Sequence, residues 1–129
     1  MTKLIKKSAE QELDILPNAR RIASIAQNYR AKNILGYDVR GLTVLADCFL
    51  MCSVTSEPQL KAVYNGVRHG MKEIGVRPLR AEGEVSGNWL VLDYGAIIFH
   101  IFRERAYEFY DLGGLWGDAP LLDLDLDED

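Results

Sequence analysis

Two histidines, two cysteines and several acidic residues are the side chains of this sequence that could do chemistry. His100 could act as a general base, and Asp93 lies on the same face of a predicted hairpin, where the two could hydrogen-bond. A base of this kind needs a nucleophile, and no Ser or Cys with suitable surroundings accompanies His100. We therefore expect the pair to shape a surface rather than to run a reaction. His69, flanked by Arg68 and Gly70, is typical of a solvated helix histidine.

The cysteines and the acidic pair around Gly83 do not by themselves define a metal site. Cys48 and Cys52 lie four residues apart on one predicted strand, which separates their Cα atoms by roughly 13 Å. A disulfide needs less than about 7 Å, and the same spacing prevents a tetrahedral zinc site, so we predict two buried, reduced thiols. Glu82 and Glu84 could hold a metal ion, although an acidic loop that pairs with basic partner residues is the expected arrangement. The sequence contains no Gly-x-Gly-x-x-Gly, Walker or His-Glu-x-x-His motif.

The elements that must position these residues are three helices and five strands. Pro17 suits the first turn of a helix, and apolar residues recur after it at three and four spacing. Ser56 and Gln59 form a capping box for a second helix, and Gly75 is its expected end. The pattern predicts a mixed α/β domain with a sheet of about five strands and packed helices. The expected helices are 17–30, 56–74 and 103–110, and the expected strands are 34–39, 48–54, 78–82, 89–93 and 96–102.

The last two strands form a hairpin with two different faces. A two-residue turn at Tyr94-Gly95 would pair Asp93 with Ala96 and Trp89 with His100. One face is wholly apolar and is expected to contact the helices. The other face is typical of a partner-binding patch, although geometry leaves open whether Trp89 is instead buried under the N-terminal helix. The apolar face carries Leu90, Leu92, Ile97, Phe99 and Ile101, and the other carries Trp89, Val91, Asp93, Ala96, Ile98 and His100.

Length and charge suggest one domain between two looser ends. The chain has 129 residues and a net charge of −4, with six acids and no base in 118–129. The remaining 15 basic and 13 acidic residues leave a nearly neutral body, which lacks the positive field of a protein that grips nucleic acid through phosphates. We expect a flexible segment 1–16, a domain 17–117 and an acidic disordered tail 118–129. The Leu-Asp alternation of the tail could also form a strand. No apolar run is long enough to span a membrane and no secretory signal is evident, so a cytoplasmic protein is expected.

An ordered set of fragments carries a resemblance to a known family. They are Arg40-Gly-Leu-Thr-Val-Leu-Ala-Asp-Cys-Phe49, Ala81-Glu-Gly-Glu84, Gly87-Asn-Trp-Leu-Val-Leu-Asp-Tyr-Gly95 and Leu115-Trp116. Thr55-Ser56, His100-Ile-Phe102 and Glu108-Phe-Tyr-Asp-Leu112 belong to the same set. In this order and spacing the fragments resemble the ribosomal silencing factor (Iojap-like) family, over about residues 17–117. The resemblance implies a nucleotidyltransferase-like fold that has lost its catalytic machinery. The sequence lacks the Gly-Ser and Asp-x-Asp signature of those enzymes.

The resemblance also implies a function without a reaction or a cofactor. The family binds a protein of the large ribosomal subunit at the intersubunit face, which blocks joining of the small subunit and lowers translation in starvation or stationary phase. We expect little direct contact with ribosomal RNA, no membrane contact and a homodimer as a possible free form. The competing readings are a residual nucleotidyltransferase-like nucleotide-binding enzyme and a plain dimerisation module.

Six residues match the family's motifs and are the predicted partner-binding residues. Trp89 would be the apolar anchor, and Asp93 and Glu82 would meet basic side chains of the ribosomal partner. The other three are His100 and Tyr94, which would add polar contacts at the rim, and Asp47.

Overall fold

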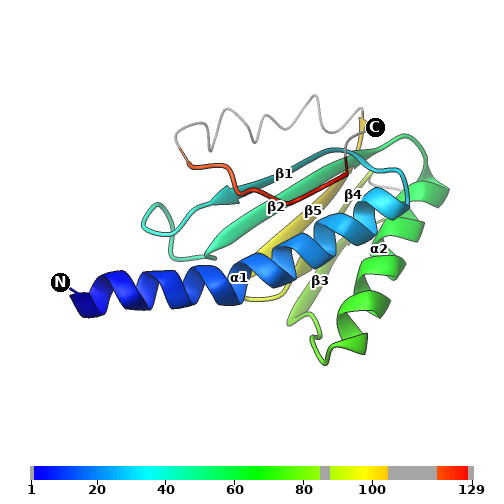
Figure 1. Cartoon of the computed structure of the whole chain (residues 1–129). Coiled ribbons are helices and arrows are strands. Elements are labelled where there is room, and N and C mark those ends of the chain that lie inside the picture. Colours follow the sequence, from blue (N-terminus) through cyan, green and yellow to red (C-terminus); the bar gives the residue numbers. More distant parts are fainter. Residues whose placement is uncertain (1, 85–87, 105–118, 128–129) are drawn as a thin grey trace.

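Five strands form one mixed sheet, and two helices lie on one of its faces (Figure 1). The computed structural model describes residues 2–84, 88–104 and 119–127. The strand order is β1-β2-β5-β4-β3, and β2 and β5 are parallel while the other neighbours are antiparallel. The predicted mixed sheet with packed helices is confirmed. The elements are α1 (Thr2–Asn28), β1 (Lys32–Asp38), β2 (Cys48–Val54), α2 (Glu57–Glu73), β3 (Arg80–Glu84), β4 (Trp89–Asp93) and β5 (Ile97–Arg103).

Helix α2 begins and ends where the sequence predicts. The Ser56 side chain accepts the backbone N–H of Gln59 at 3.2 Å, which satisfies one of the unpaired donors of the first turn. The Gln59 amide oxygen accepts the N–H of Thr55 at 2.8 Å, so the reciprocal cap forms one residue before the expected capping box. Gly75 follows the helix with φ +79°, a left-handed conformation that glycine adopts without strain.

Helix α1 begins earlier than expected. It starts at Thr2 and contains Pro17 in its interior, so residues 2–16 are helical where a flexible segment was predicted. A proline removes its own N–H from the ladder and its ring crowds the carbonyl four residues earlier, at a cost of about 3 kcal/mol, but α1 continues on both sides of Pro17. Pro17, taken as a residue of the first turn, therefore placed the predicted start of the helix too late. The predicted apolar stripe is confirmed by the burial of Ala19, Ile22, Ala23 and Ala26.

The two helices pack closely through glycines of α2. A Cβ atom on Gly66 would meet the ring of Tyr29, and one on Gly70 would meet Ile25. Arg21 crosses the same contact and donates two hydrogen bonds to the carbonyl of Gly70, at 3.1 and 2.9 Å. Close approach of α1 thus offsets the helix propensity that these glycines cost, roughly 1 kcal/mol each.

The β4–β5 hairpin keeps its predicted faces but not its predicted register. Asp93 pairs with Ile98 and Trp89 with Phe102, two residues beyond the expected partners. The turn is wider because the Asp93 carboxylate accepts the N–H of Gly95 at 2.7 Å and the N–H of Tyr94 donates to the carbonyl of Ile97 at 2.8 Å. A shift of two residues leaves every side chain on its predicted face, because the side-chain period of a strand is two.

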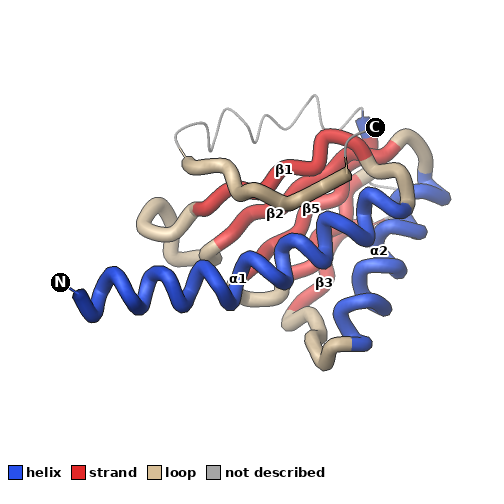
Figure 2. Tube along the Cα trace, in the orientation of Figure 1, coloured by secondary structure: helices blue, strands red, loops and turns tan. Residues whose placement is uncertain are grey.

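The acidic C-terminal segment is part of the folded domain over its described residues. Residues 119–127 lie beside β1, between that strand and α1 (Figures 1 and 2). Asp38 donates its N–H to Pro120 and Leu122 donates to Gly36, each at 2.8 Å. Leu124 is buried in the main core. This corrects the expectation of a disordered tail. The backbone of the segment pairs with the outer edge of β1, whose N–H and C=O groups would otherwise be unpaired, and Leu122, Leu124 and Leu126 pack against the main core.

The sheet has an apolar cluster on each side. The larger cluster lies between the sheet and the helices, and the smaller one lies on the other face and includes Met51 and Phe102. Cys48 and Cys52 are free and buried, and burial raises the pKa of the Cys48 thiol to about 12. Within the described part of the chain, no helix has the length and apolar character to cross a membrane. The expected helix 103–110 lies outside the described residues from 105 onward.

Candidate functional site

The structure divides the six predicted site residues into two groups. Asp47, Asp93 and Tyr94 lie at one end of the sheet, where β2 and β5 begin and β4 ends. Glu82, Trp89 and His100 lie along β3, β4 and β5, away from that end. The six residues therefore do not form one compact cluster.

Backbone hydrogen bonds tie the end of the sheet together. The N–H groups of Asp47 and Cys48 both donate to the carbonyl of Ala96 at 2.9 Å, and Leu79 donates to the carbonyl of Asp93 at 2.7 Å. The start of β2, the β4–β5 turn and the residue before β3 are thereby held in fixed relative positions. Side chains presented at this end belong to one rigid surface.

Four exposed apolar side chains lie at the same end of the sheet, and none of them was predicted from the sequence as a site residue. Leu42, Val44 and Leu45 belong to the loop between β1 and β2, and their exposed fractions are 54%, 102% and 69%. Leu79 is 78% exposed and packs beside Gly95 of the β4–β5 turn. The signal was present as a run of apolar residues directly after Arg40-Gly41, in a segment that forms no strand. We refer to Leu42, Val44, Leu45 and Leu79 together with Asp47 and Asp93 as the end surface.

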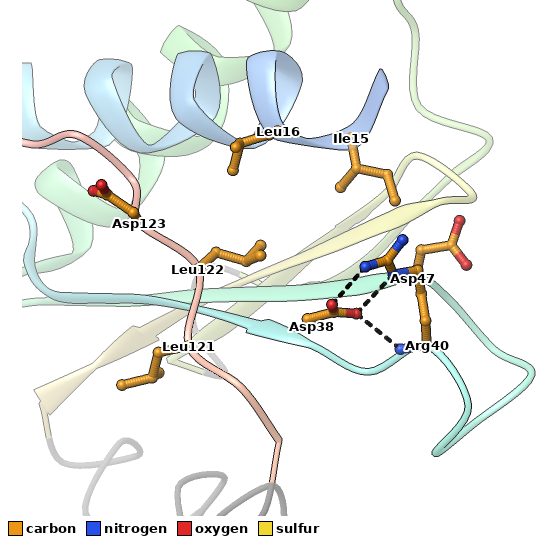
Figure 3. Close-up of a pocket in the computed structure, with 8 residues that line it drawn as sticks. All are labelled: Ile15, Leu16, Asp38, Arg40, Asp47, Leu121, Leu122 and Asp123. Atoms are coloured by element: carbon orange, nitrogen blue, oxygen red, sulfur yellow. Dashed lines mark hydrogen bonds and ion pairs between the residues drawn. The ribbon is translucent and has the colours of Figure 1, made fainter. Parts of the chain in front are cut away.

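The loop that carries three of these side chains is anchored at its base. Arg40 binds the Asp38 carboxylate through two guanidinium nitrogens, at 2.9 and 2.7 Å, as Figure 3 shows. Hydrogen bonding to Arg40 holds the pKa of Asp38 below its usual value. Leu42 and Thr43 both donate their N–H groups to the carbonyl of Val39, at 3.0 and 3.2 Å. The loop is therefore preorganised, which lowers the entropy lost when a partner binds it.

A small cleft lies behind this loop. It is bordered by Ile15 and Leu16 of α1, by Asp38, Arg40 and Asp47, and by Leu121–Asp123 of the C-terminal segment (Figure 3). Its volume is about 200 Å³. Small-molecule pockets usually have roughly 300–1,000 Å³, so this cleft is small for a nucleotide. Among the described residues, no group of three or more His, Cys, Asp or Glu side chains could hold a metal ion.

Trp89 and His100 form a hydrogen-bonded aromatic pair on the face opposite the helices. The indole Nε1–H donates to Nδ1 of His100 at 3.3 Å, and the two rings stack with centroids 6.0 Å apart. Phe49 and Phe102 stack on the same imidazole, at 5.4 and 5.8 Å. Trp89 is half-buried and packs against the smaller apolar cluster.

The environment of His100 keeps it neutral. Burial lowers the pKa of the imidazole to about 4. Because Nδ1 accepts the Trp89 proton, the ring proton sits on Nε2, which is buried and has no hydrogen-bond partner. Asp93 does not bond to His100, because the register sets Asp93 opposite Ile98 and His100 opposite Val91, and the Asp93 carboxylate accepts the N–H of Gly95. The Asp93–His100 pair considered from the sequence is not formed.

Glu82 and Tyr94 occupy different environments from Trp89. Glu82 is exposed and pairs with Arg80 at 3.4 Å. Tyr94 packs against the main core on the helix side, and burial raises the pKa of its hydroxyl to about 12. Its hydroxyl oxygen is buried and has no hydrogen-bond partner. Tyr94 therefore contributes to the end of the sheet mainly through its backbone turn.

Sequence comparisons relate the chain to proteins named ribosomal silencing factors and to Iojap proteins. A family model described as "Ribosomal silencing factor during starvation" matches residues 12–129, which include the C-terminal segment. A ribosomal silencing factor of Bacillus subtilis is 35% identical over 103 residues, which cover 80% of this chain and 87% of that protein. A chloroplastic Iojap protein of Zea mays is 28% identical over 92% of this chain and 52% of its own length.

Solved structures agree with this assignment at the level of the fold. A crystal structure of a Chromobacterium violaceum protein superposes with a TM-score of 0.74 at 29% identity, and covers 78% of this chain and 84% of that one. A crystal structure from Bacillus halodurans has a TM-score of 0.70 at 24% identity, and covers 86% and 98%. Fold and surface together define a small α/β domain with a rigid, partly apolar end. The chain belongs to the ribosomal silencing factor family.

Proposed function

We propose that this protein binds a protein of the large ribosomal subunit at the intersubunit face, and that the end surface is its main contact. The observation that carries the proposal is the preorganised loop with Leu42, Val44 and Leu45 exposed beside Asp47. Clustered exposed apolar side chains on a small domain are typical of protein-binding sites. Membership of the ribosomal silencing factor family supports a ribosomal partner.

The charge of the end surface fits a basic partner. Asp47 and Asp93 lie at the same end of the sheet as the apolar side chains, and ribosomal proteins carry basic residues where they meet RNA. Rim acids of this kind steer association and set orientation, while desolvated apolar groups provide most of the affinity. The exposed Glu82 extends the same acidic character along β3.

Trp89 and His100 are proposed to support this contact from the adjacent face. The stacked rings fix the indole in one orientation, which favours a Trp anchor because little side-chain entropy is then lost on binding. Tyr94 supports it by holding the turn that presents Asp93 and Gly95.

The proposed mechanism is steric exclusion. A domain of this size bound at the intersubunit face occupies space that the small subunit needs, so translation is lowered during starvation without any reaction or cofactor. The proposal places the protein in the cytoplasm, where the subunits join. We also propose that the free protein can form a homodimer through the exposed loop, since an apolar patch without its partner favours self-association.

Co-sedimentation with purified large subunits tests the proposal. Val44→Asp combined with Leu45→Asp places two charges where apolar groups should be desolvated, and both side chains are exposed, so the fold is retained. We expect the double variant to lose at least tenfold in affinity. Lys61→Asp, an exposed change on α2 away from the end surface, is the matched control and should bind as the wild type does. Equal binding of the double variant and the wild type would refute the end surface as the contact.

A further inference from the structure

A basic groove runs along α2 and the segment that follows it. It is lined by Asn65, Arg68, His69, Lys72, Arg77 and Pro78, and encloses about 400 Å³. No carboxylate is among these lining residues. Arg68 and Lys72 are four residues apart on one helix, so their side chains lie next to each other on its surface. The groove therefore concentrates positive charge in a protein whose net charge is −4.

The cations of this groove have no acidic partner among the described residues, unlike four other arginines of the chain. Arg21, Arg40, Arg80 and Arg103 each pair with a carboxylate. Arg68, Lys72 and Arg77 form no ion pair with any residue that the structure describes. Glu73 is the acid closest in sequence, and both of its carboxylate oxygens are engaged. Oε2 binds Arg21 at 3.4 Å and Oε1 binds His69 at 3.2 Å.

Tyr64 holds Arg68 in place without neutralising it. The guanidinium carbon lies 5.4 Å from the centre of the Tyr64 ring, and Nη1 donates to the Tyr64 hydroxyl at 3.3 Å. Arg68 is also near Tyr94, where it opposes the rise in hydroxyl pKa that burial causes. The groove thus borders the β4–β5 turn that carries Asp93 of the end surface. When a protein of the large subunit binds the end surface, the parts of the subunit beside that protein would lie close to the cations of the groove.

We propose that this groove binds the phosphodiester backbone of ribosomal RNA beside the docked ribosomal protein. The inference rests on the proposed function and adds a second, electrostatic contact to it. Unpaired Arg and Lys side chains on one face bind phosphate oxygens well, because guanidinium and ammonium groups donate charge-assisted hydrogen bonds. The groove contains no carboxylate that would repel phosphate groups, and Asn65 is its one neutral amide, so it fits a chain of repeated phosphate groups. Because the rest of the domain is nearly neutral, we expect this contact to be limited to the groove. The groove contacts phosphates and does not recognise the RNA sequence.

Salt dependence of binding to purified large subunits measures the contact. Each phosphate neutralised contributes roughly 0.7–0.9 to the slope of log affinity against log salt. The triple variant Arg68→Gln, Lys72→Gln, Arg77→Gln should therefore have a slope shallower by about 2 to 3. Between 50 and 200 mM KCl the wild type should lose about 20- to 40-fold more affinity than the variant.

A charge-matched control separates the groove from net charge. Arg30→Gln, Lys32→Gln, Lys61→Gln removes three exposed cations outside the groove and should keep the wild-type slope. An unchanged slope for the groove variant, or an equal change in both variants, would overturn the inference. If the wild type itself fails to bind large subunits, the proposed function is refuted. If the wild type binds and the groove variant has the same salt slope as the wild type, only the present inference is refuted.

Cross-linking identifies what occupies the groove. Asn65→Cys carries the only accessible thiol among the described residues, because Cys48 and Cys52 are buried, and a benzophenone label can be attached there. Cross-links to ribosomal RNA are expected when labelled protein is irradiated on the large subunit. Cross-links confined to an acidic protein would show a different partner and contradict the proposal.

Discussion

The indole nitrogen of Trp89 donates its proton to Nδ1 of His100 across the β4–β5 hairpin, at 3.3 Å. This bond requires a neutral imidazole with its proton on Nε2. Trp89 and His100, which the sequence places on the same face of the hairpin, therefore form one unit, stacked with Phe49 and Phe102. A protonated His100 could not accept the bond, so the unit depends on pH.

Acidification should destabilise the fold through His100. Its pKa is about 4 in the folded protein and about 6.5 when unfolded, so the unfolded state binds the proton first as the pH falls. The free energy of unfolding should decrease by up to about 3 kcal/mol between pH 7 and pH 4. Asp38 contributes outside this window, because hydrogen bonding to Arg40 lowers its pKa and its contribution is lost only at more acidic pH. Urea unfolding at a series of pH values measures the effect.

His100→Phe is the matched variant for this measurement. Phenylalanine keeps a ring in the stack and removes the titrating group, so the difference between pH 7 and pH 4 should shrink. A pH profile identical to that of the wild type would show that another group causes the decrease.

Trp89→Phe should lower the free energy of unfolding, although an aromatic ring still occupies the position of the indole. The ring remains, but Nδ1 of His100 loses its donor, which should cost about 1–2 kcal/mol. A double-mutant cycle with His100→Phe isolates the hydrogen bond, because the second change should cost less once the first is made. Additive losses would mean that the two residues act independently.

Asp93 has two separable roles, in the turn and in charge. Asp93→Asn keeps an oxygen that can accept the Gly95 N–H, so stability should change by less than about 0.5 kcal/mol. Asp93→Ala removes the acceptor and should cost about 1 kcal/mol. Both variants should bind large subunits about two- to fivefold more weakly, as expected for loss of one rim charge. Full affinity in Asp93→Asn would exclude the carboxylate charge from the contact.

Leu124 should be a stabilising residue of the C-terminal segment. Its side chain is only 7% exposed and packs in the main core, so Leu124→Ala should lower the free energy of unfolding by about 2–3 kcal/mol. Leu121 lies in the same segment but is 62% exposed, and Leu121→Ala should change stability by less than about 0.5 kcal/mol. Thermal unfolding of the two variants compares them directly. Equal melting temperatures would mean that the segment is not held against β1.

Local patterning predicted the faces of the sheet, because a strand's side chains alternate whatever its register. Leu90, Phe99 and Ile101 face the helices as expected. The register itself depended on one side-chain hydrogen bond, from Gly95 to Asp93, which the sequence does not reveal. The closeness of Asp47 to the β4–β5 turn depended on the parallel pairing of β2 with β5, a long-range contact.

The C-terminal segment was misjudged for a similar reason. Its Leu-Asp alternation fits both a solvated tail and an added edge strand, and the choice depends on which strand lies at the edge. Arg20 and Gln27 of α1 bind the backbone of Asp123 and Asp127, at 2.9 and 2.8 Å, which again joins residues far apart in sequence. The exposure of Leu42, Val44 and Leu45 was not predicted, because a short apolar run does not by itself show whether its side chains are buried.

A subunit-joining assay tests the central claim most directly. Large subunits are incubated with the protein, small subunits are added, and joined ribosomes are quantified by gradient sedimentation. The wild type and Lys61→Asp should both prevent joining, whereas Val44→Asp with Leu45→Asp should allow it at the same protein concentration. Full inhibition by that double variant, or joining unaffected by the wild type, would contradict the account.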